Sequence, residues 1–275
     1  MRLTLIALLA LALSAGAALA QDVEPAAEEA AQIPAAAAAG QRVSDDLVAL
    51  YRFDNVIGGR VIPDLTADIG GLDLIIQGAI LGVPLETISV RDDGLRFGAV
   101  EEAQIPGVFS TEPATSIVEP VRASGQLTLE AWVTPAADNL TGPARIVSIS
   151  RDSAERNITL GQNNDTYGLR LRTTGTNEQG TPDVFTEAGT LRVDEPQHVV
   201  VTFDGEMTAI YIDGEVAFRG NQHAGDLANW DETMCLVVGN EADGNRRWLG
   251  TVHLMAIYSY ALSPAQVLTN FSAGL

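Results

Sequence analysis

The chain has 275 residues, with 36 acidic side chains against 16 basic ones, all of them arginine, and a net charge of −20. Such a surface repels nucleic acids and anionic membranes, so neither is expected as a partner. A single cysteine, Cys235, excludes an internal disulfide framework and a cysteine-based metal centre, while an apolar content of 46% is enough for a core.

Residues 1–20 are typical of a secretory signal peptide. Arg2 precedes an apolar run from Leu3 to Leu13, and small residues follow up to Ala20. The run is too short to span a bilayer, and no later stretch approaches the roughly 20 apolar residues that spanning requires. We therefore expect an exported protein, periplasmic or secreted, with no membrane span.

Residues 21–44 consist mainly of Ala, Glu, Gln and Pro. Pro25, Pro34 and Gly40 favour a disordered linker over a short Ala-rich helix. We therefore place one folded domain at residues 45–275.

Within this domain, apolar and polar residues alternate, and turn residues recur at short intervals, as in β-strands. Asp204-Gly205 and Asp213-Gly214 predict tight turns between successive antiparallel strands. Ser263, Pro264 and Gln266 predict the start of a short helix near the C-terminus. The pattern predicts an all-β fold, a sandwich of two antiparallel sheets. Besides those within 197–215, the expected strands are Leu47 to Phe53, Gly94 to Phe97, Leu127 to Val133, Arg145 to Ile149, Asn157 to Leu160, Tyr167 to Arg172, Cys235 to Val238 and Trp248 to Ser259.

Three carboxylates after the first strand are candidate metal ligands. Asp54, Asp64 and Asp68 lie in a glycine-rich segment, and oxygen ligands on loops suit calcium. Their spacing is not that of an EF-hand, and the alternative is that they are ordinary turn residues. We expect at most one structural calcium ion.

The strand Leu127 to Val133 carries two candidate ligand-binding residues, Glu130 and Trp132. Alternation directs both side chains to the face opposite the core, where a carboxylate and an indole can hold a sugar. The alternative is that a loop covers Trp132 and an arginine pairs with Glu130, as is common in sandwiches. Trp230 and Trp248 are further candidates for stacking on a sugar.

Arginines are concentrated between residues 145 and 172. Arg170 and Arg172 alternate with leucines and so share the polar face of their strand. One interpretation is a bidentate grip on an acidic sugar or a sulfate. The alternative is a solvated face on which these arginines pair with nearby Asp and Glu.

No catalytic residues are predicted. The chain lacks nucleophile and phosphate-binding motifs, and its three histidines are scattered. Sandwich glycosidases need two facing carboxylates. These are commonly delivered by one strand with the pattern Glu-x-Asp-x-x-Glu. The nearest match is Glu241 to Arg246, which has Arg in the place of the second Glu. Its Asp243-Gly244-Asn245 instead predicts a hairpin turn.

Several segments together resemble a laminin G-like domain of the concanavalin A-like lectin/glucanase superfamily, over about residues 45–275. They are Leu47 to Asp54, Leu127 to Val133, His198 to Gly205, Ile210 to Gly214, Trp248 to Tyr258 and Ala261 to Ser263. The resemblance implies a jelly-roll sandwich of the kind found in exported bacterial proteins. It also implies a binding or adhesion module, often with one calcium ion at a loop rim.

The leading hypothesis is an exported, non-catalytic module that binds a glycan or a cell-envelope or extracellular protein through a sheet face or a loop rim. A second hypothesis is a divergent polysaccharide-degrading enzyme, a glycoside hydrolase or lyase that uses Glu130. A third is a purely structural envelope protein. The sequence does not separate the first from the third.

Overall fold

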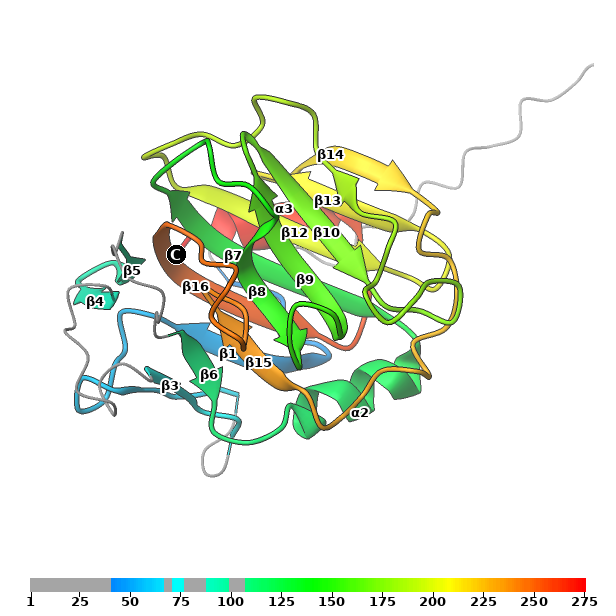
Figure 1. Cartoon of the computed structure of the whole chain (residues 1–275), viewed down its shortest axis with the longest axis horizontal. Helices are drawn as coiled ribbons and strands as arrows, with labels where there is room; N and C mark the ends of the chain where they lie inside the picture. Colours follow the sequence, from blue (N-terminus) through cyan, green and yellow to red (C-terminus); the bar gives the residue numbers. More distant parts are fainter. Residues whose placement is uncertain (1–40, 67–70, 77–87, 99–106) are drawn as a thin grey trace, which may run out of the picture. The chain divides into compact units, whose positions relative to one another are not determined.

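The computed structural model describes residues 41–66, 71–76, 88–98 and 107–275. The predicted signal peptide and most of the predicted linker lie outside these residues. Two antiparallel sheets pack face to face (Figure 1), so the predicted all-β sandwich is confirmed. Two short helices accompany the sheets in the described part of the chain.

The first sheet has eight strands within the described residues, and β7 and β16 lie at its centre. The order is β14 (Glu215–Gly220), β13 (Thr208–Ile212), β12 (Gln197–Phe203), β7 (Leu127–Pro135), β16 (Gly250–Tyr258), β5 (Gly94–Phe97) and β4 (Ile88–Arg91), and β1 (Leu47–Arg52) also pairs with β16.

The second sheet also has eight strands among the described residues. The order is β11 (Val184–Phe185), β10 (Thr166–Leu171), β9 (Arg156–Asn163), β8 (Ala144–Ser150), β15 (Cys235–Val238), β6 (Val108–Ser110), β3 (Leu74–Ile76) and β2 (Val61–Ile62).

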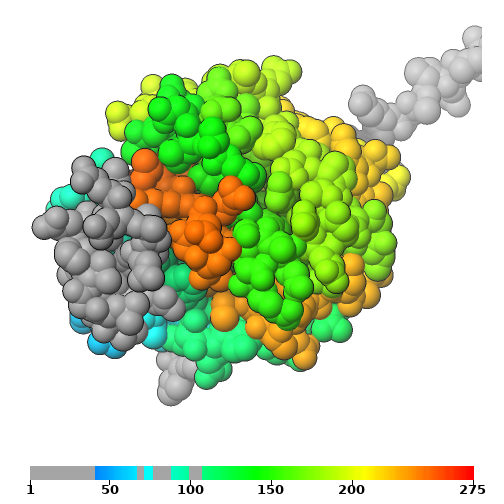
Figure 2. Space-filling model, viewed as in Figure 1, coloured from blue at the N-terminus to red at the C-terminus, as the bar shows by residue number. Residues whose placement is uncertain are grey.

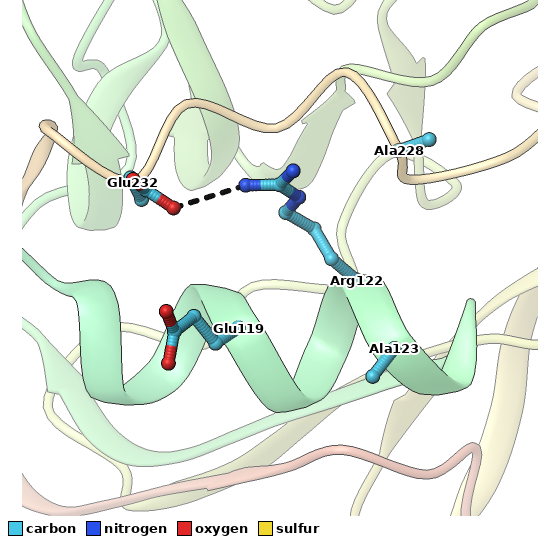
Figure 3. Close-up of a pocket in the computed structure, with 5 residues that line it drawn as sticks. All are labelled: Glu119, Arg122, Ala123, Ala228 and Glu232. Atoms are coloured by element: carbon cyan, nitrogen blue, oxygen red, sulfur yellow. Dashed lines mark hydrogen bonds and ion pairs between the residues drawn. The ribbon is translucent and has the colours of Figure 1, made fainter.

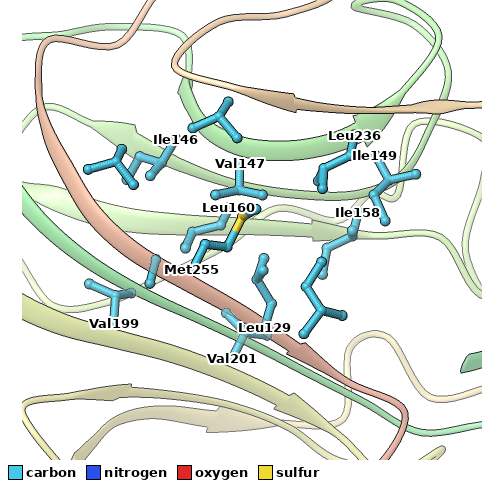
Figure 4. Close-up of a cluster of buried hydrophobic side chains, with 14 of the residues drawn as sticks. Leu129, Ile146, Val147, Ile149, Ile158, Leu160, Val199, Val201, Leu236 and Met255 are labelled. Carbon is cyan, nitrogen blue, oxygen red and sulfur yellow. The ribbon is translucent and has the colours of Figure 1, made fainter. Parts of the chain in front are cut away.

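The core lies between the two sheets, as the alternation on β7 predicts. Leu129 of β7 and Val201 of β12 meet Ile158 and Leu160 of β9 in one buried cluster (Figure 4). Trp132 of β7 belongs to a second apolar cluster on the outer face of the first sheet. Both faces of β7 are therefore buried, which explains why nearly all of its residues are inaccessible.

The turns follow the Asp-Gly signals in part. Asp213 and Gly214 both have positive φ, at 53° and 86°, and join β13 to its antiparallel partner β14 as predicted. Gly244 also has positive φ, but its turn connects β15 to β16, which belong to different sheets. The predicted hairpin there is wrong, because the chain crosses between the layers at this point.

Helix α2 (Thr115–Ser124) was not predicted, because Pro120 inside it removes a backbone donor and disfavours a helix in the sequence pattern. Its buried face consists of Ile117, Val118 and Val121, and it ends at Gly125 in the left-handed conformation. This apolar spacing and terminal glycine are the signals that indicate it.

Helix α3 (Pro264–Ala273) begins as predicted. The Ser263 hydroxyl accepts from the Gln266 amide, and the Gln266 side chain accepts from the Ser263 amide, which completes a capping box. The helix packs on the outer face of the first sheet through Val267 and Phe271. Among the described residues, neither helix is long and apolar enough to cross a membrane.

Candidate functional site

Glu130 lies at the centre of a buried polar network. Its carboxylate accepts hydrogen bonds from Arg42, from His198 Nε2 at 2.7 Å, from Asn270 Nδ2 at 2.7 Å and from the Tyr258 hydroxyl at 3.4 Å. Burial alone would raise the pKa of Glu130, but the hydrogen bond from His198 and the charge of Arg42 outweigh it and lower the pKa. Glu130 is fully buried and ionised, so it faces no open groove.

Trp132 lies beside this network, under helix α3. Its ring stacks on that of Phe271, with the ring centroids 5.8 Å apart, and the centroid of the His198 ring lies 4.9 Å from that of Trp132. Only 8% of Trp132 is exposed. The expectation of an open sugar-binding face at Glu130 and Trp132 is therefore corrected. The alternative holds for the Arg-paired Glu and for a covered Trp, but a helix covers the Trp where a loop was expected. The cover is α3, and the arginine is Arg42 from the predicted linker.

The two other predicted stacking residues are also inside the domain. Trp248 is fully buried, and its Nε1 donates to the Gln162 side chain at 2.8 Å. Trp230 is 2% exposed, and its Nε1 donates to the Arg172 carbonyl at 2.8 Å. Neither indole presents a free ring face, because each is held by packing and by its own hydrogen bond.

The two predicted arginines have different surroundings. Arg170 forms a bidentate pair with Asp183, with Nε and Nη2 donating at 2.7 and 2.8 Å. The guanidinium of Arg172 makes no hydrogen bond or ion pair to any described residue, and its Nε is buried. Arg170 is therefore satisfied within the protein, whereas Arg172 has unused donors.

Arg172 lines a polar depression of about 610 Å³, which we name the loop-rim pocket. Three connections form it: Ala154 and Glu155 of the β8–β9 turn, residues 172 and 176–179 after β10, and Asn229 between β14 and β15. The green, yellow-green and yellow-orange surfaces of these connections adjoin one another in Figure 2. The volume is within the range of ligand sites in proteins.

Partly buried hydrogen bonds fix one wall of the loop-rim pocket. The Asn157 side chain donates to the Asp231 carbonyl and accepts from the Asp231 amide, both at 2.8 Å. Asn229 Nδ2 donates to the Thr173 carbonyl at 2.9 Å. With the bond from Trp230 to Arg172, these contacts attach the wall to the second sheet. The sequence does not single out Asn157, because nothing in a strand pattern shows that one asparagine will bridge to a distant loop.

The pocket lining is close to electrically neutral. Glu155 accepts from Arg151 at 2.5 Å, so its charge is compensated, and Arg172 and Glu178 bring opposite charges. A hydrogen bond from Thr233 is the main cause of the lowered pKa of neighbouring Asp231, and the charges of Arg151 and Arg172 contribute. Asn177, Gln179 and Asn229 add amide donors and acceptors. Such a lining suits a ligand rich in hydroxyl groups.

The predicted calcium ligands do not gather among the described residues. Asp54 pairs with Arg52, and Asp64 Oδ1 accepts from the Leu50 amide and from the Thr66 amide and hydroxyl. Asp68 lies outside the described residues. No group of three or more His, Cys, Asp or Glu side chains suited to a metal occurs in the part that the structure describes.

Comparison with known families agrees with the fold. A family model of the laminin G type, described as the concanavalin A-like lectin/glucanases superfamily, matches residues 110–268. The chain belongs to this superfamily. The matched region contains α2, strands β7 to β16 and the loop-rim pocket, so this superfamily domain carries the candidate site within the shared part of its fold.

Solved structures similar to this superfamily domain include both enzymes and binding domains. Trypanosoma rangeli sialidase in complex with sialic acid has a TM-score of 0.59 at 16% identity, over 83% of this chain and 33% of that one. The receptor-binding domain of botulinum neurotoxin C/D mosaic serotype has a TM-score of 0.59 at 11% identity, over 84% and 52%. The binding domain of Paraclostridial Mosquitocidal Protein 1 has a TM-score of 0.57 at 15% identity, over 82% and 52%.

The chain spans from about a third to about half the length of these solved chains. At such identities the likeness concerns the fold alone. No curated protein matches the sequence significantly.

Proposed function

We propose that this chain is an exported, non-catalytic binding module that recognises a neutral glycan of a cell-envelope or extracellular partner in the loop-rim pocket. The observation that carries the proposal is the Arg172 guanidinium, which lines a ligand-sized polar pocket. It makes no hydrogen bond or salt bridge to a described residue, and its charge acts on Asp231 only at longer range. A buried donor without a hydrogen bond, such as Arg172 Nε, costs free energy unless a ligand or water uses it.

The chemistry of the pocket supports a neutral glycan over an acidic one. Arg172 offers donors to sugar hydroxyls, while the exposed Glu178 carboxylate offers acceptors. The net charge of −20 repels polyanions at long range, and the lining has no excess of positive charge. The similar solved structures include proteins whose names refer to sialic acid and to receptor binding, which is consistent with a carbohydrate-related role.

The enclosure of Glu130 supports a module without catalysis. A glycosidase carboxylate must reach the scissile bond together with a second carboxylate. Glu130 is instead fully buried under α3, and protein donors occupy both of its oxygens. Hydrolysis through this residue requires the helix to leave the sheet.

Substitution of Arg172 tests the proposal. We expect a neutral polysaccharide, such as a β-glucan, mannan or xylan, to retard the full chain in affinity electrophoresis. Arg172→Ala should weaken binding roughly tenfold to a hundredfold, because a charged hydrogen bond contributes about 1.5–3 kcal/mol. Arg219→Ala is the matched control, since Arg219 is exposed on β14 and makes no contact to the pocket.

Three results would contradict this proposal. The first is that none of these polysaccharides, nor the acidic polygalacturonate and heparan sulfate, retards the wild-type chain. The second is that only the acidic ones retard it. The third is that Arg172→Ala and Arg219→Ala weaken binding equally, which would show that net charge acts and not the pocket.

We also propose one structural calcium ion, bound by loop carboxylates of the segment that carries Asp54, Asp64 and Asp68, since oxygen ligands on loops suit calcium. An ion bound only to the folded state stabilises it by mass action, so excess EDTA should lower the melting temperature of the chain, and added calcium should restore it. Calcium-saturated EDTA is the control. A melting temperature that EDTA leaves unchanged would contradict the proposed calcium ion.

A further inference from the structure

A second depression adjoins the loop-rim pocket on the other side of the β14–β15 connection. It has a volume of about 390 Å³ and lies between α2 and residues 228–232 (Figure 3). Glu119, Arg122 and Ala123 of the helix face Ala228 and Glu232 of the connection across it. We name it the helix pocket.

One short segment of chain separates the two pockets. Ala228 lines the helix pocket and Asn229 lines the loop-rim pocket, and consecutive Cα atoms are only about 3.8 Å apart. The segment is held on both sides: the Trp230 indole donates to the Arg172 carbonyl, and the Thr115 hydroxyl donates to the Glu232 carbonyl at 3.2 Å. It therefore forms a narrow, fixed ridge between two depressions.

The helix pocket has unused polar groups of its own. The Glu119 carboxylate is exposed and has no hydrogen bond or ion pair among the described residues. Arg122 reaches across the pocket to Glu232 through Nη1 at 3.1 Å, which leaves further donors on the same guanidinium. The small side chains of Ala123 and Ala228 leave room for a ring with an apolar C–H face.

We infer that the glycan site continues over the ridge, so that an extended oligosaccharide occupies the loop-rim pocket and the helix pocket together. This inference rests on the proposed function of the loop-rim pocket. In both pockets a carboxylate and a guanidinium are available to sugar hydroxyls, and neither lining has an excess of positive charge. The class of ligand is thus a neutral chain of several sugar units that binds along its length, not at one end.

A length series tests the inference. The probes are the disaccharide and the hexasaccharide of the neutral polysaccharide that retards the full chain most strongly, titrated by calorimetry. The hexasaccharide should bind about tenfold more tightly than the disaccharide, because it gains hydrogen bonds in the helix pocket. Glu119→Ala and Arg122→Ala should each reduce this ratio several-fold, and alanine at these exposed positions favours the helix.

The control and the contrary results separate this inference from the proposed function. Glu206→Ala removes an exposed carboxylate from the β12–β13 turn and should leave both affinities unchanged. Equal affinity for the two probes, or a ratio that Glu119→Ala and Arg122→Ala do not alter, would overturn the extended site and leave the loop-rim pocket intact. No measurable binding of either probe would overturn both.

Discussion

Replacement of Glu130 by alanine is expected to destabilise the domain by about 3–5 kcal/mol, since removal of one partner leaves other buried polar groups uncompensated. The Glu130 carboxylate is the shared acceptor for Arg42 before the first strand and for Asn270 on α3. Arg42 also donates to the Gly274 carbonyl at 2.7 Å, and Asn270 accepts from the Val43 amide at 2.9 Å. Both the segment at residue 42 and the C-terminal helix therefore depend on one buried charge.

Urea unfolding followed by tryptophan fluorescence measures this effect, because Trp132 lies beside the network. We expect a lower midpoint and an unchanged m-value, as for a loss of stability without a change in the surface exposed. Glu187→Ala is the matched control, since Glu187 is exposed, its side chain has no partner among the described residues, and surface changes usually stay within about 0.5 kcal/mol. A loss below about 1 kcal/mol for Glu130→Ala would show that water replaces the carboxylate.

The pH dependence of stability gives a second measurement on the same residue. The pKa of Glu130 in the folded state lies below the ordinary value of 4.5, so the unfolded chain binds a proton there first as the pH falls. The stabilisation is present above pH 4.5 and is lost as the pH falls through the lowered folded-state pKa. Glu130→Gln should have lower stability at neutral pH and a shallower decline in acid than the wild type.

The sheets were predictable from the sequence because alternation and turn signals are local. The predicted strands Gly94 to Phe97 and Cys235 to Val238 match β5 and β15, and the faces of β7 are as predicted. Short strands such as β2 and β11 have only two residues, too few for a period of two to be recognised. Alternation also shows that the side chains of Glu130 and Trp132 point away from the core, but not that the C-terminal helix α3 covers them.

The candidate site was predictable only in part. The sequence places Arg170 and Arg172 on one polar face. Only the tertiary structure shows that Arg170 pairs with Asp183, whereas the Arg172 guanidinium forms no hydrogen bond or salt bridge with a described residue. Tryptophan suggests a sugar platform, yet Trp230 acts here as a fixed support behind the pocket wall. The residues that line the loop-rim pocket come from three connections, and no local pattern indicates that these meet.

A second large effect is expected at Glu241. The substitution Glu241→Ala should lower the free energy of unfolding by about 3–5 kcal/mol. Arg145 Nε donates to its carboxylate at 2.9 Å, the Ser150 hydroxyl donates to the other oxygen, and Arg156 Nη1 lies 4.0 Å away. Burial, and then the charge of Arg145, lowers the pKa of Arg156 to about 10. This cluster of two buried cations and one anion already lacks negative charge, so the loss of Glu241 leaves Arg145 and Arg156 in mutual repulsion.

The consequence should reach the loop-rim pocket, because Arg156 begins β9 directly after Ala154 and Glu155 of the pocket lining. The Arg156 amide also donates to the Glu178 carbonyl at 3.0 Å. This hydrogen bond connects the β8–β9 turn to the segment 176–179 on the other side of the pocket. We expect faster amide hydrogen exchange at residues 154–156 in Glu241→Ala, together with the lower urea midpoint. Glu232→Ala is the control, since its pair with Arg122 is exposed and contributes at most about 1 kcal/mol. Equal losses in the two variants would mean that Arg145 and Arg156 reach water, and that the pocket wall does not depend on the buried carboxylate.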